Sequence, residues 1–335
     1  MKRWTGNPII HAGMDTRMGT NINGPSLIRV PDWIEKPLGR YYLYFGHHEG
    51  QYIRLAYADD IRGPWRMHEP GVLPLSQSGF DIDWDDSATD QFELPHDGNW
   101  ERPHLASPDA VVDHAARKIR LYFHGLIRSD THAQCTRVAL SDDGLDFDVK
   151  PQLLGPAYFR VFQWQDAWYS WAMPGQILRS QDGLQRFRSV PGVPHGDDWF
   201  LAKTREELKE RFIAMAGGLT FPPTSRHAGV LLRGNALWVV FSRVGDAPER
   251  LLFTTVKLDS NWTEWKRDDL YDLMEPETDY EGVDLPAEPS TYGAVLDRRA
   301  RQLRDPCLFE EDGRIWLLYA AAGEHAIGLA ELVPR

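Results

Sequence analysis

Carboxylates, guanidinium groups and imidazoles recur in this sequence at the starts of short apolar segments and in the polar turns that join such segments. The starts carry Asn23, Asp109, Arg160, Arg226, His227, Arg304 and Asp305, and the turns carry His47, His48, His124, Arg243, Glu249 and Glu324. Arg102 and His104 stand just ahead of one start. Gathering such groups at one place costs free energy unless they bind one another or a polar ligand. We therefore predict a site for a polar ligand where these positions meet.

Each of these residues also has a purely structural interpretation. Asp305 could pair with the adjacent Arg304, and Asp109 could be a turn residue. His47 and His124 stand at the ends of apolar segments, where hydrogen bonding within the protein is the simpler role. The prediction of a site therefore rests on the group as a whole.

The apolar segments that must position these residues come in groups of three, and the last group is the clearest. Its segments are 306–310, 314–320 and 326–332, and Glu311-Asp312-Gly313 joins the first two. An Asp-Gly turn between two apolar runs predicts a β-hairpin. The group is therefore expected to form an antiparallel meander of three strands.

Four further groups repeat this pattern. They are 25–30 with 40–45 and 52–59, 108–113 with 118–124 and 134–141, 158–163 with 167–172 and 175–180, and 228–233 with 236–241 and 250–258. A repeated meander is typical of a β-propeller, and the near absence of helical periodicity argues against Rossmann and α/β-barrel folds. We predict a single all-β domain over residues 1–335, a five-bladed β-propeller with blades at about 23–73, 106–155, 156–193, 226–270 and 303–335.

Each blade should also have a fourth, outer strand. Four groups continue with a turn and an aromatic residue, at 63–67, 145–149, 185–188 and 263–266. The last group ends without such a segment, whereas residues 1–10 carry the missing pattern. We therefore predict that the N-terminal strand completes the last blade and leaves no free sheet edge.

Three connections between blades are long, and long loops on a compact scaffold usually form a binding site. They span 67–106, 191–225 and 267–303. The second holds the one predicted helix, 203–216, with Thr204 as its N-cap. These connections are expected to surround one mouth of the central channel.

Charge and hydropathy exclude several classes of protein. The formal net charge of −12 argues against a nucleic-acid partner, and no apolar run is long enough to predict a membrane span. The start of the chain shows no apolar leader segment, so a cytoplasmic location is expected. Cys135 and Cys307 fall in predicted strands, where buried free thiols are expected rather than a disulfide. The sequence does not indicate an oligomeric state.

The repeat and its opening triplets resemble the five-bladed propeller glycoside hydrolases, the group of families 32, 43, 62, 68, 117 and 130. The resemblance spans the chain at the level of blades and is carried by Arg304-Asp305-Pro306, by Ser107-Pro108-Asp109 and by Ser-x-Asp-Gly turns at 141–144 and 180–183. It implies a carbohydrate substrate bound in a funnel at the central axis and no required cofactor. Some members hold a Ca²⁺ or Na⁺ ion in the central channel, which is an option here too.

The resemblance also implies roles for the acidic residues. Glycoside cleavage needs an acid that protonates the leaving oxygen and a carboxylate that activates water or attacks carbon. Asp109 and Asp305 are expected as the essential carboxylates, one as the base and the other as the base or as the group that adjusts the pKa of the acid. Family 43 enzymes place the base at the opening of the first blade, but this chain has Asn23-Gly24-Pro25 there.

No glutamate opens the third blade, so the acid is expected from a connection, as Glu281 or Glu288, with His227 or His104 as substitutes. The expected substrate-binding residues are Asn23, His48, Arg102, His104, His124, Arg160, Arg226, His227, Arg243 and Arg304. Arginines suit the carboxylate of an acidic sugar. The resulting hypothesis is an exo-acting glycoside hydrolase for a small oligosaccharide, an anionic one included, in polysaccharide degradation.

Two other functions remain open. A non-catalytic carbohydrate-binding propeller would keep the aromatic and arginine side chains without a close pair of carboxylates. A metal-dependent lyase or hydrolase would instead use the histidines, although no close spacing such as His-x-x-x-His supports a zinc site. Its candidate ligands are His47, His48, His104, His124 and His227.

Overall fold

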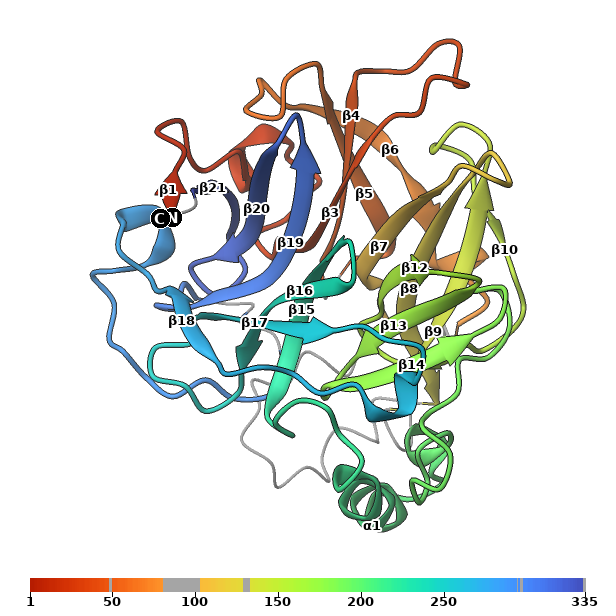
Figure 1. Ribbon diagram of the computed structural model, residues 1–335. Coiled ribbons are helices and arrows are strands. Elements are labelled where there is room, and N and C mark those ends of the chain that lie inside the picture. Colours follow the sequence, from red (N-terminus) through yellow and green to blue (C-terminus); the bar gives the residue numbers. More distant parts are fainter. Residues whose placement is uncertain (48–49, 81–102, 129–132, 294, 296–297, 334–335) are drawn as a thin grey trace.

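Five antiparallel β-sheets surround a common axis in the computed structural model (Figure 1). The structure describes residues 1–335 except 48–49, 81–102, 129–132, 294, 296–297 and 334–335. The first strands of the five sheets contact one another around the axis, so each sheet is a blade with its first strand innermost. The predicted five-bladed β-propeller is confirmed.

The blades follow the order of the chain. Blade 1 consists of β3 (Asn23–Arg29), β4 (Tyr41–Gly46), β5 (Tyr52–Ala58) and β6 (Arg66–Pro74). Blade 2 consists of β7 (Ala106–Asp113), β8 (Lys118–Arg128) and β9 (Ala133–Ser141), with β10 (Asp148–Val149) and β11 (Gly155–Pro156) both paired to β9. Blade 3 consists of β12 (Arg160–Trp164), β13 (Ala167–Ala172) and β14 (Gln176–Ser180). Blade 4 consists of β15 (Ser225–Arg233), β16 (Ala236–Arg243), β17 (Leu251–Lys257) and β18 (Tyr271–Met274).

Blade 5 is built from both ends of the chain. Its inner strands are β19 (Leu303–Glu311), β20 (Arg314–Ala321) and β21 (Ala326–Leu332). Its outer edge is formed by β1 (Lys2–Arg3), which pairs with Ala330 and Glu331, and by β2 (Ile10–His11), which pairs with Ala326 and Ile327. The N-terminal segment therefore completes the last blade, as predicted, and closes the ring (Figure 1).

The outer strands of blades 3 and 4 differ from the prediction. Residues 185–188 contribute only one isolated bridge, between Arg179 and Arg188. Residues 263–266 overlap a 3-10 turn, Trp262–Glu264, and the outer strand of blade 4 comes later, as β18. The aromatic residue in this segment serves packing instead, because the buried Trp265 ring lies 5.3 Å from that of Trp164 and its indole donates to the Asp259 carbonyl.

The hydrophobic core is divided into five layers, one between each pair of neighbouring blades. Side chains alternate between the two faces of a strand, and β4 makes this visible. Tyr42 and Tyr44 pack toward blade 2, whereas Leu43 and Phe45 pack toward blade 5. Burial on both faces explains the nearly continuous apolar runs of the inner strands.

The connection between blades 3 and 4 contains the helix α1 (Arg205–Ala216). The side chain of Thr204 caps its N-terminus by accepting a hydrogen bond from the backbone N–H of Glu207.

Among the described residues, none of the helices has the length and apolar character needed to cross a membrane. Cys135 and Cys307 are buried free thiols, as predicted. Short 3-10 turns occur at Ala12–Met14, Leu75–Gln77, Trp199–Leu201, Trp262–Glu264 and Asp279–Glu281.

Candidate active site

Every blade presents one residue with a positive φ angle at the start of its innermost strand. In β3, β7, β15 and β19 the pairing register breaks at this point, as in a β-bulge. A bulge residue is left out of the ladder and its side chain is redirected, and non-glycine residues in this conformation concentrate at functional sites. Five residues with positive φ, four of them non-glycine, surround the axis and mark a candidate site. They are Gly24 (60°), Ser107 (44°), Tyr158 (61°), His227 (47°) and Asp305 (46°).

Blade 1 places no side chain at this position. A Cβ on Gly24 would lie 2.6 Å from the Cα of Ser107, so the backbones of blades 1 and 2 approach too closely for any other residue. Asn23, which the sequence predicted as substrate-binding, is fully buried, and its amide donates to the Asn21 side chain at 2.8 Å. The acidic group of the site must therefore come from another blade.

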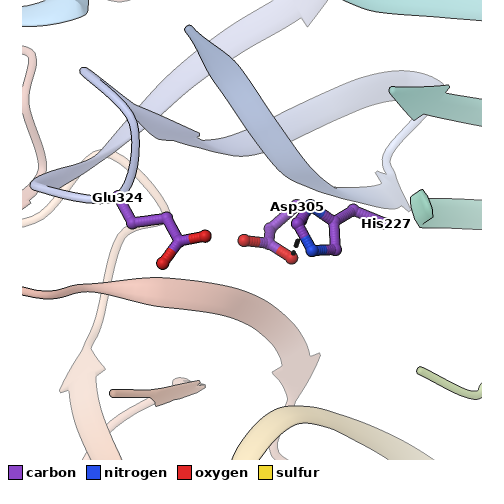
Figure 2. Close-up of side chains that lie close together, drawn as sticks. All are labelled: His227, Asp305 and Glu324. Atoms are coloured by element: carbon purple, nitrogen blue, oxygen red, sulfur yellow. Dashed lines mark ion pairs between the residues drawn. The ribbon is translucent and has the colours of Figure 1, made fainter. Parts of the chain in front are cut away.

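Blades 4 and 5 supply three titratable side chains that converge near the axis (Figure 2). His227 Nδ1 lies 3.4 Å from Asp305 Oδ1, and one carboxylate oxygen of Glu324 lies within 4.8 Å of both side chains. Their side chains are 3%, 1% and 0% exposed. We call His227, Asp305 and Glu324 the axial cluster.

Glu324 reaches the axial cluster from the turn between β20 and β21. Its carboxylate accepts a hydrogen bond from Arg304 Nη1 at 2.9 Å and another from Asn21 Nδ2 at 2.8 Å. Charge-assisted bonds of this kind stabilise a buried negative charge. Glu324 is therefore held in one orientation, pointing toward Asp305 (Figure 2).

Two arginines behind the cluster share one buried carboxylate. Glu249 accepts from Arg226 Nε at 3.0 Å, from Arg226 Nη2 at 2.7 Å and from Arg304 Nε at 3.1 Å. Burial alone would raise the pKa of Glu249, but the two guanidinium groups hold it below its usual value. The three residues form a charged network that is almost completely excluded from solvent.

Aromatic rings line the cluster on the side of blade 3. The Tyr158 ring centroid lies 4.8 Å from that of His227 and 4.4 Å from that of His124, and His104 lies 6.1 Å beyond His124. Burial raises the pKa of Tyr158, and the nearby charges of Asp305 and Glu324 raise it further. Its hydroxyl therefore stays protonated and can donate a hydrogen bond. The sequence prediction had placed His104, His124 and His227 in the site, and the structure brings these three together.

Asp109 makes a different set of contacts. Its Oδ2 accepts from the backbone N–H of Val161 at 2.7 Å, and its Oδ1 lies 3.7 Å from Arg160 Nη1. Arg160 in turn donates to the carbonyls of Pro108 and Ala228. Burial raises the pKa of Asp109 to about 6, although Arg160 and the Val161 N–H oppose the shift. These contacts tie blades 2, 3 and 4 together.

Blade 1 repeats the Asp109 contact with a residue that has no charge. Ser26 follows its bulge residue by two positions, as Asp109 follows Ser107, and its hydroxyl accepts from the backbone N–H of Ala110 on blade 2 at 2.8 Å. The position is thus a recurrent link between neighbouring blades. This parallel favours a structural role for Asp109 over the expected catalytic one.

The structure does not bring Glu281 to the axial cluster. Its carboxylate accepts from Arg3 Nε at 2.8 Å, from Tyr319 at 2.8 Å and from the backbone N–H of Glu277 at 2.8 Å, beside the outermost strand of blade 5. Burial alone would raise the pKa of Glu281, but Arg3 and these donors hold it below its usual value, which is the opposite of what a general acid needs. The structure therefore speaks against the predicted acid role.

The other predicted residues are distributed as follows. Glu288 is exposed and lies 3.5 Å from Arg298, and Arg243 pairs with Asp246 at 3.0 Å. His48 and Arg102 lie outside the described residues.

Glu324, Glu249 and Tyr158 were not chosen from the sequence as catalytic or binding residues. The two glutamates had been counted among the polar turn residues expected at the mouth of the channel, but no catalytic or binding role had been given to them. Such a turn is short and opens directly on the mouth of the channel, whereas the glutamates that were chosen, Glu281 and Glu288, belong to a long connection. The length of the turn was the signal that could have identified Glu324.

The axial cluster could also hold a cation. One imidazole nitrogen and two carboxylate oxygens within 4.8 Å of one another form a donor set that suits divalent transition metals. The described residues of the chain contain no other group of three such side chains so close together.

The amino-acid sequence has a relative among known proteins. No known family profile matches the chain. The uncharacterized protein R118 of Acanthamoeba polyphaga mimivirus is 35% identical over 347 aligned residues, which cover 98% of this chain and 89% of that protein.

Solved structures with the same fold include glycoside hydrolases. A family 43 β-xylosidase/α-arabinofuranosidase from a compost microbial metagenome matches with a TM-score of 0.54 at 13% identity, over 100% of this chain and 96% of that one. An α-L-arabinofuranosidase from Lactobacillus brevis matches with a TM-score of 0.52 at 12% identity, over 98% and 93%. A family 32 β-fructofuranosidase from Bombyx mori matches with a TM-score of 0.52 at 14% identity, over 93% and 60%. The chain thus belongs to the same protein family as protein R118, and it has the fold of the five-bladed propeller glycoside hydrolases.

Proposed function

We propose that the chain is a glycoside hydrolase that acts at the axial cluster on the end of a small oligosaccharide. One observation carries this proposal: two carboxylates and an imidazole converge near the axis of the propeller, from Asp305, Glu324 and His227. Paired carboxyl groups are what glycoside cleavage requires. The cluster is almost completely buried, and such a site admits the end of a sugar chain more readily than its middle.

The surroundings of the two carboxylates suggest separate roles. Arg304 and Asn21 hold Glu324 as an anion, so Glu324 is the proposed nucleophile. Asp305 lies beside the imidazole of His227, from which it can receive a proton, so Asp305 is the proposed acid. The separation within 4.8 Å is nearer to the roughly 5–5.5 Å of retaining enzymes than to the roughly 6.5–9.5 Å of inverting ones. Retention of configuration is therefore proposed, and NMR of the first product anomer tests it.

The arginines favour a neutral sugar at this site. Arg226 and Arg304 bind Glu249 and Glu324, and Arg160 binds backbone carbonyls beside Asp109. Guanidinium groups that are already paired with carboxylates offer little to a substrate carboxylate. The expectation of an anionic substrate rested on these three arginines together with Arg243 and Arg102. Arg243 pairs with Asp246, and Arg102 lies outside the described residues, so the four described arginines give that expectation no support.

The test is a screen of aryl glycosides, beginning with xylosides and arabinofuranosides because structural neighbours carry those names. The wild type is compared with Asp305→Asn and Glu324→Gln, each checked for an unchanged melting temperature. Asparagine tolerates the positive φ of position 305. Loss of kcat by about 10³-fold in both variants is the expected result. No turnover of any sugar, with sugars still bound by all three proteins, would instead indicate a carbohydrate-binding propeller.

A metal-dependent hydrolase or lyase is the second candidate, because the axial cluster is also a possible donor set for a cation. Its ligands would be His227, Asp305 and Glu324 rather than the larger group of histidines. Elemental analysis of the purified protein separates the two proposals. A stoichiometric divalent metal, with activity lost in EDTA and restored by that metal, would favour the second. A Ca²⁺ or Na⁺ ion with no effect on kcat would be structural.

A further inference from the structure

We infer that Glu249 is a positioning residue that sets the spacing of His227 and Asp305 by joining the innermost strands of blades 4 and 5. The inference rests on the proposed function, because it gives the spacing a catalytic purpose. The structural part of the inference, that Glu249 fixes this spacing, can be tested without any substrate.

In each of the two strands an arginine directly precedes a residue of the axial cluster. Arg226 directly precedes His227 in β15, and Arg304 directly precedes Asp305 in β19. Each arginine therefore adjoins a bulge residue whose backbone conformation is strained, and fixing the arginine limits how far its neighbour can move. Blades 4 and 5 share this arrangement of arginine followed by a bulge residue of the axial cluster.

Both arginines converge on the one carboxylate of Glu249. Arg226 binds it through two parallel bonds of 3.0 and 2.7 Å, and Arg304 adds a third of 3.1 Å. The fork geometry of a guanidinium makes such bonds directional as well as strong. Three bonds to a single carboxylate therefore tie the two strands together just behind the axial cluster.

Further contacts extend the link beyond the side-chain carboxylate. The backbone carbonyl of Glu249 accepts from the N–H of Leu303, the first residue of β19, at 3.0 Å. Arg304 also binds Glu324 at 2.9 Å, so that Glu249, Arg304 and Glu324 form one chain of ion pairs. All three members of the axial cluster are thus connected to Glu249. His227 and Asp305 are each next in the chain to an arginine that binds Glu249, and Glu324 binds Arg304 itself.

A buried ion pair elsewhere in the chain supplies the control. Asp113 at the end of β7 pairs with Arg120 at 2.5 Å, and both side chains are less than 10% exposed. This pair lies at the opposite end of its strand from the bulge at Ser107. Asp113→Asn therefore removes a buried charge of the same kind without touching the axial cluster.

The experiment compares Glu249→Gln with Asp113→Asn in three measurements. The first is the melting temperature, and the second is the separation of kcat from KM on the best glycoside found. The third is the NMR resonance of the His227 imidazole at fixed pH, which senses its distance from the Tyr158 ring. It is assigned by its absence in His227→Asn.

The expected result for Glu249→Gln is a fall in kcat of about tenfold to 100-fold with KM changed less than about threefold, because misplacement of reacting groups acts mainly on kcat. The His227 resonance should shift as well. Asp113→Asn should lower the melting temperature comparably and change neither kcat nor the resonance. A Glu249→Gln protein with unchanged kcat and resonance would overturn the inference.

A second variant covers the case in which Glu249→Gln does not fold. Glu249→Asp keeps the charge but is shorter by one methylene, so it cannot reach both arginines. The inference predicts a shifted His227 resonance here too, and a resonance at the wild-type position would overturn it. If the wild type cleaves no glycoside, the proposed function fails, and the resonance still decides whether Glu249 positions His227.

Discussion

Blades 2 and 5 open with the same backbone geometry and use it differently. In both, a residue with positive φ precedes a proline, at Ser107-Pro108 with 44° and at Asp305-Pro306 with 46°. In blade 5 the acidic residue is the bulge residue itself, Asp305, and belongs to the axial cluster. In blade 2 the acidic residue follows two positions later, as Asp109, and binds the backbone of blade 3.

The difference follows from what a bulge does to the strand. The bulge residue is left out of the ladder, whereas the residue two positions later is paired again, Asp109 with Tyr122 and Cys307 with Leu318. Asp109 and Cys307 thus occupy equivalent places, and burial raises the pKa of both, to about 6 and about 11. The aspartate of Ser-Pro-Asp therefore lies in the paired part of its strand, whereas the aspartate of Arg-Asp-Pro lies in the bulge.

Giving blade 5 the bulge residue of blade 2 should have the largest effect. Asp305→Ser places at this position a residue that already adopts the same φ at position 107. We expect kcat to fall by about 10³-fold or more with little change in melting temperature, because a reacting carboxyl group is lost without new backbone strain. Steady-state kinetics and calorimetry measure the two quantities. Activity within tenfold of the wild type would remove Asp305 from the chemistry.

Removing residues 1–10 should separate the two blades by stability. Blade 5 would lose its outer strands and the burial of Ile9 and Ile10, and the buried Glu281 would lose Arg3, whereas blade 2 would keep every strand. We expect the melting temperature to fall by about 10 °C or more and unfolding to become less cooperative. Calorimetry tests this, with hydrogen exchange in β8 and β20 as the comparison of the two blades. A truncated protein that melts like the full chain would contradict the closure of blade 5.

Asp109→Asn should change stability rather than catalysis. The folded-state pKa of about 6 lies above the ordinary value, so the protonated carboxyl stabilises the fold at low pH, and this contribution is lost as pH rises through about 6. Between pH 4 and pH 7 the wild type should therefore lose about 2 kcal/mol relative to the variant. Urea unfolding at several pH values measures this difference. We expect kcat to stay within about threefold, and a loss near 10³-fold would return Asp109 to the catalytic residues.

Glu288→Gln should have the smallest effect. Its side chain is 56% exposed and its carboxylate lies 3.5 Å from the exposed Arg298, and ion pairs of this kind contribute little to stability. We expect kcat to change less than twofold and the melting temperature by about 1 °C or less. A large loss of kcat would mean that the exposed connection reaches the substrate.

The sequence by itself determined the architecture of this protein. Short apolar runs, Asp-Gly turns and the grouping of these runs in threes are local properties, and they predicted five blades. The unmatched pattern of residues 1–10 predicted the closure of blade 5, which the pairing of β1 and β2 with β21 confirms. The N-cap of α1 at Thr204 was readable for the same reason, since the capping bond spans only three residues.

Only the tertiary structure decided which acidic residues meet. The bulge that turns Asp305 toward His227 and Glu324 is a feature of strand pairing, and the residue types of the triplet Arg304-Asp305-Pro306 do not predict it. Glu324 accepts a hydrogen bond from Asn21, 303 residues away, and Glu281 pairs with Arg3, 278 residues away. Contacts over such separations depend on ring closure and on the register of each strand. A side chain's role at the axis follows from the direction in which the register points it, which the local sequence does not specify.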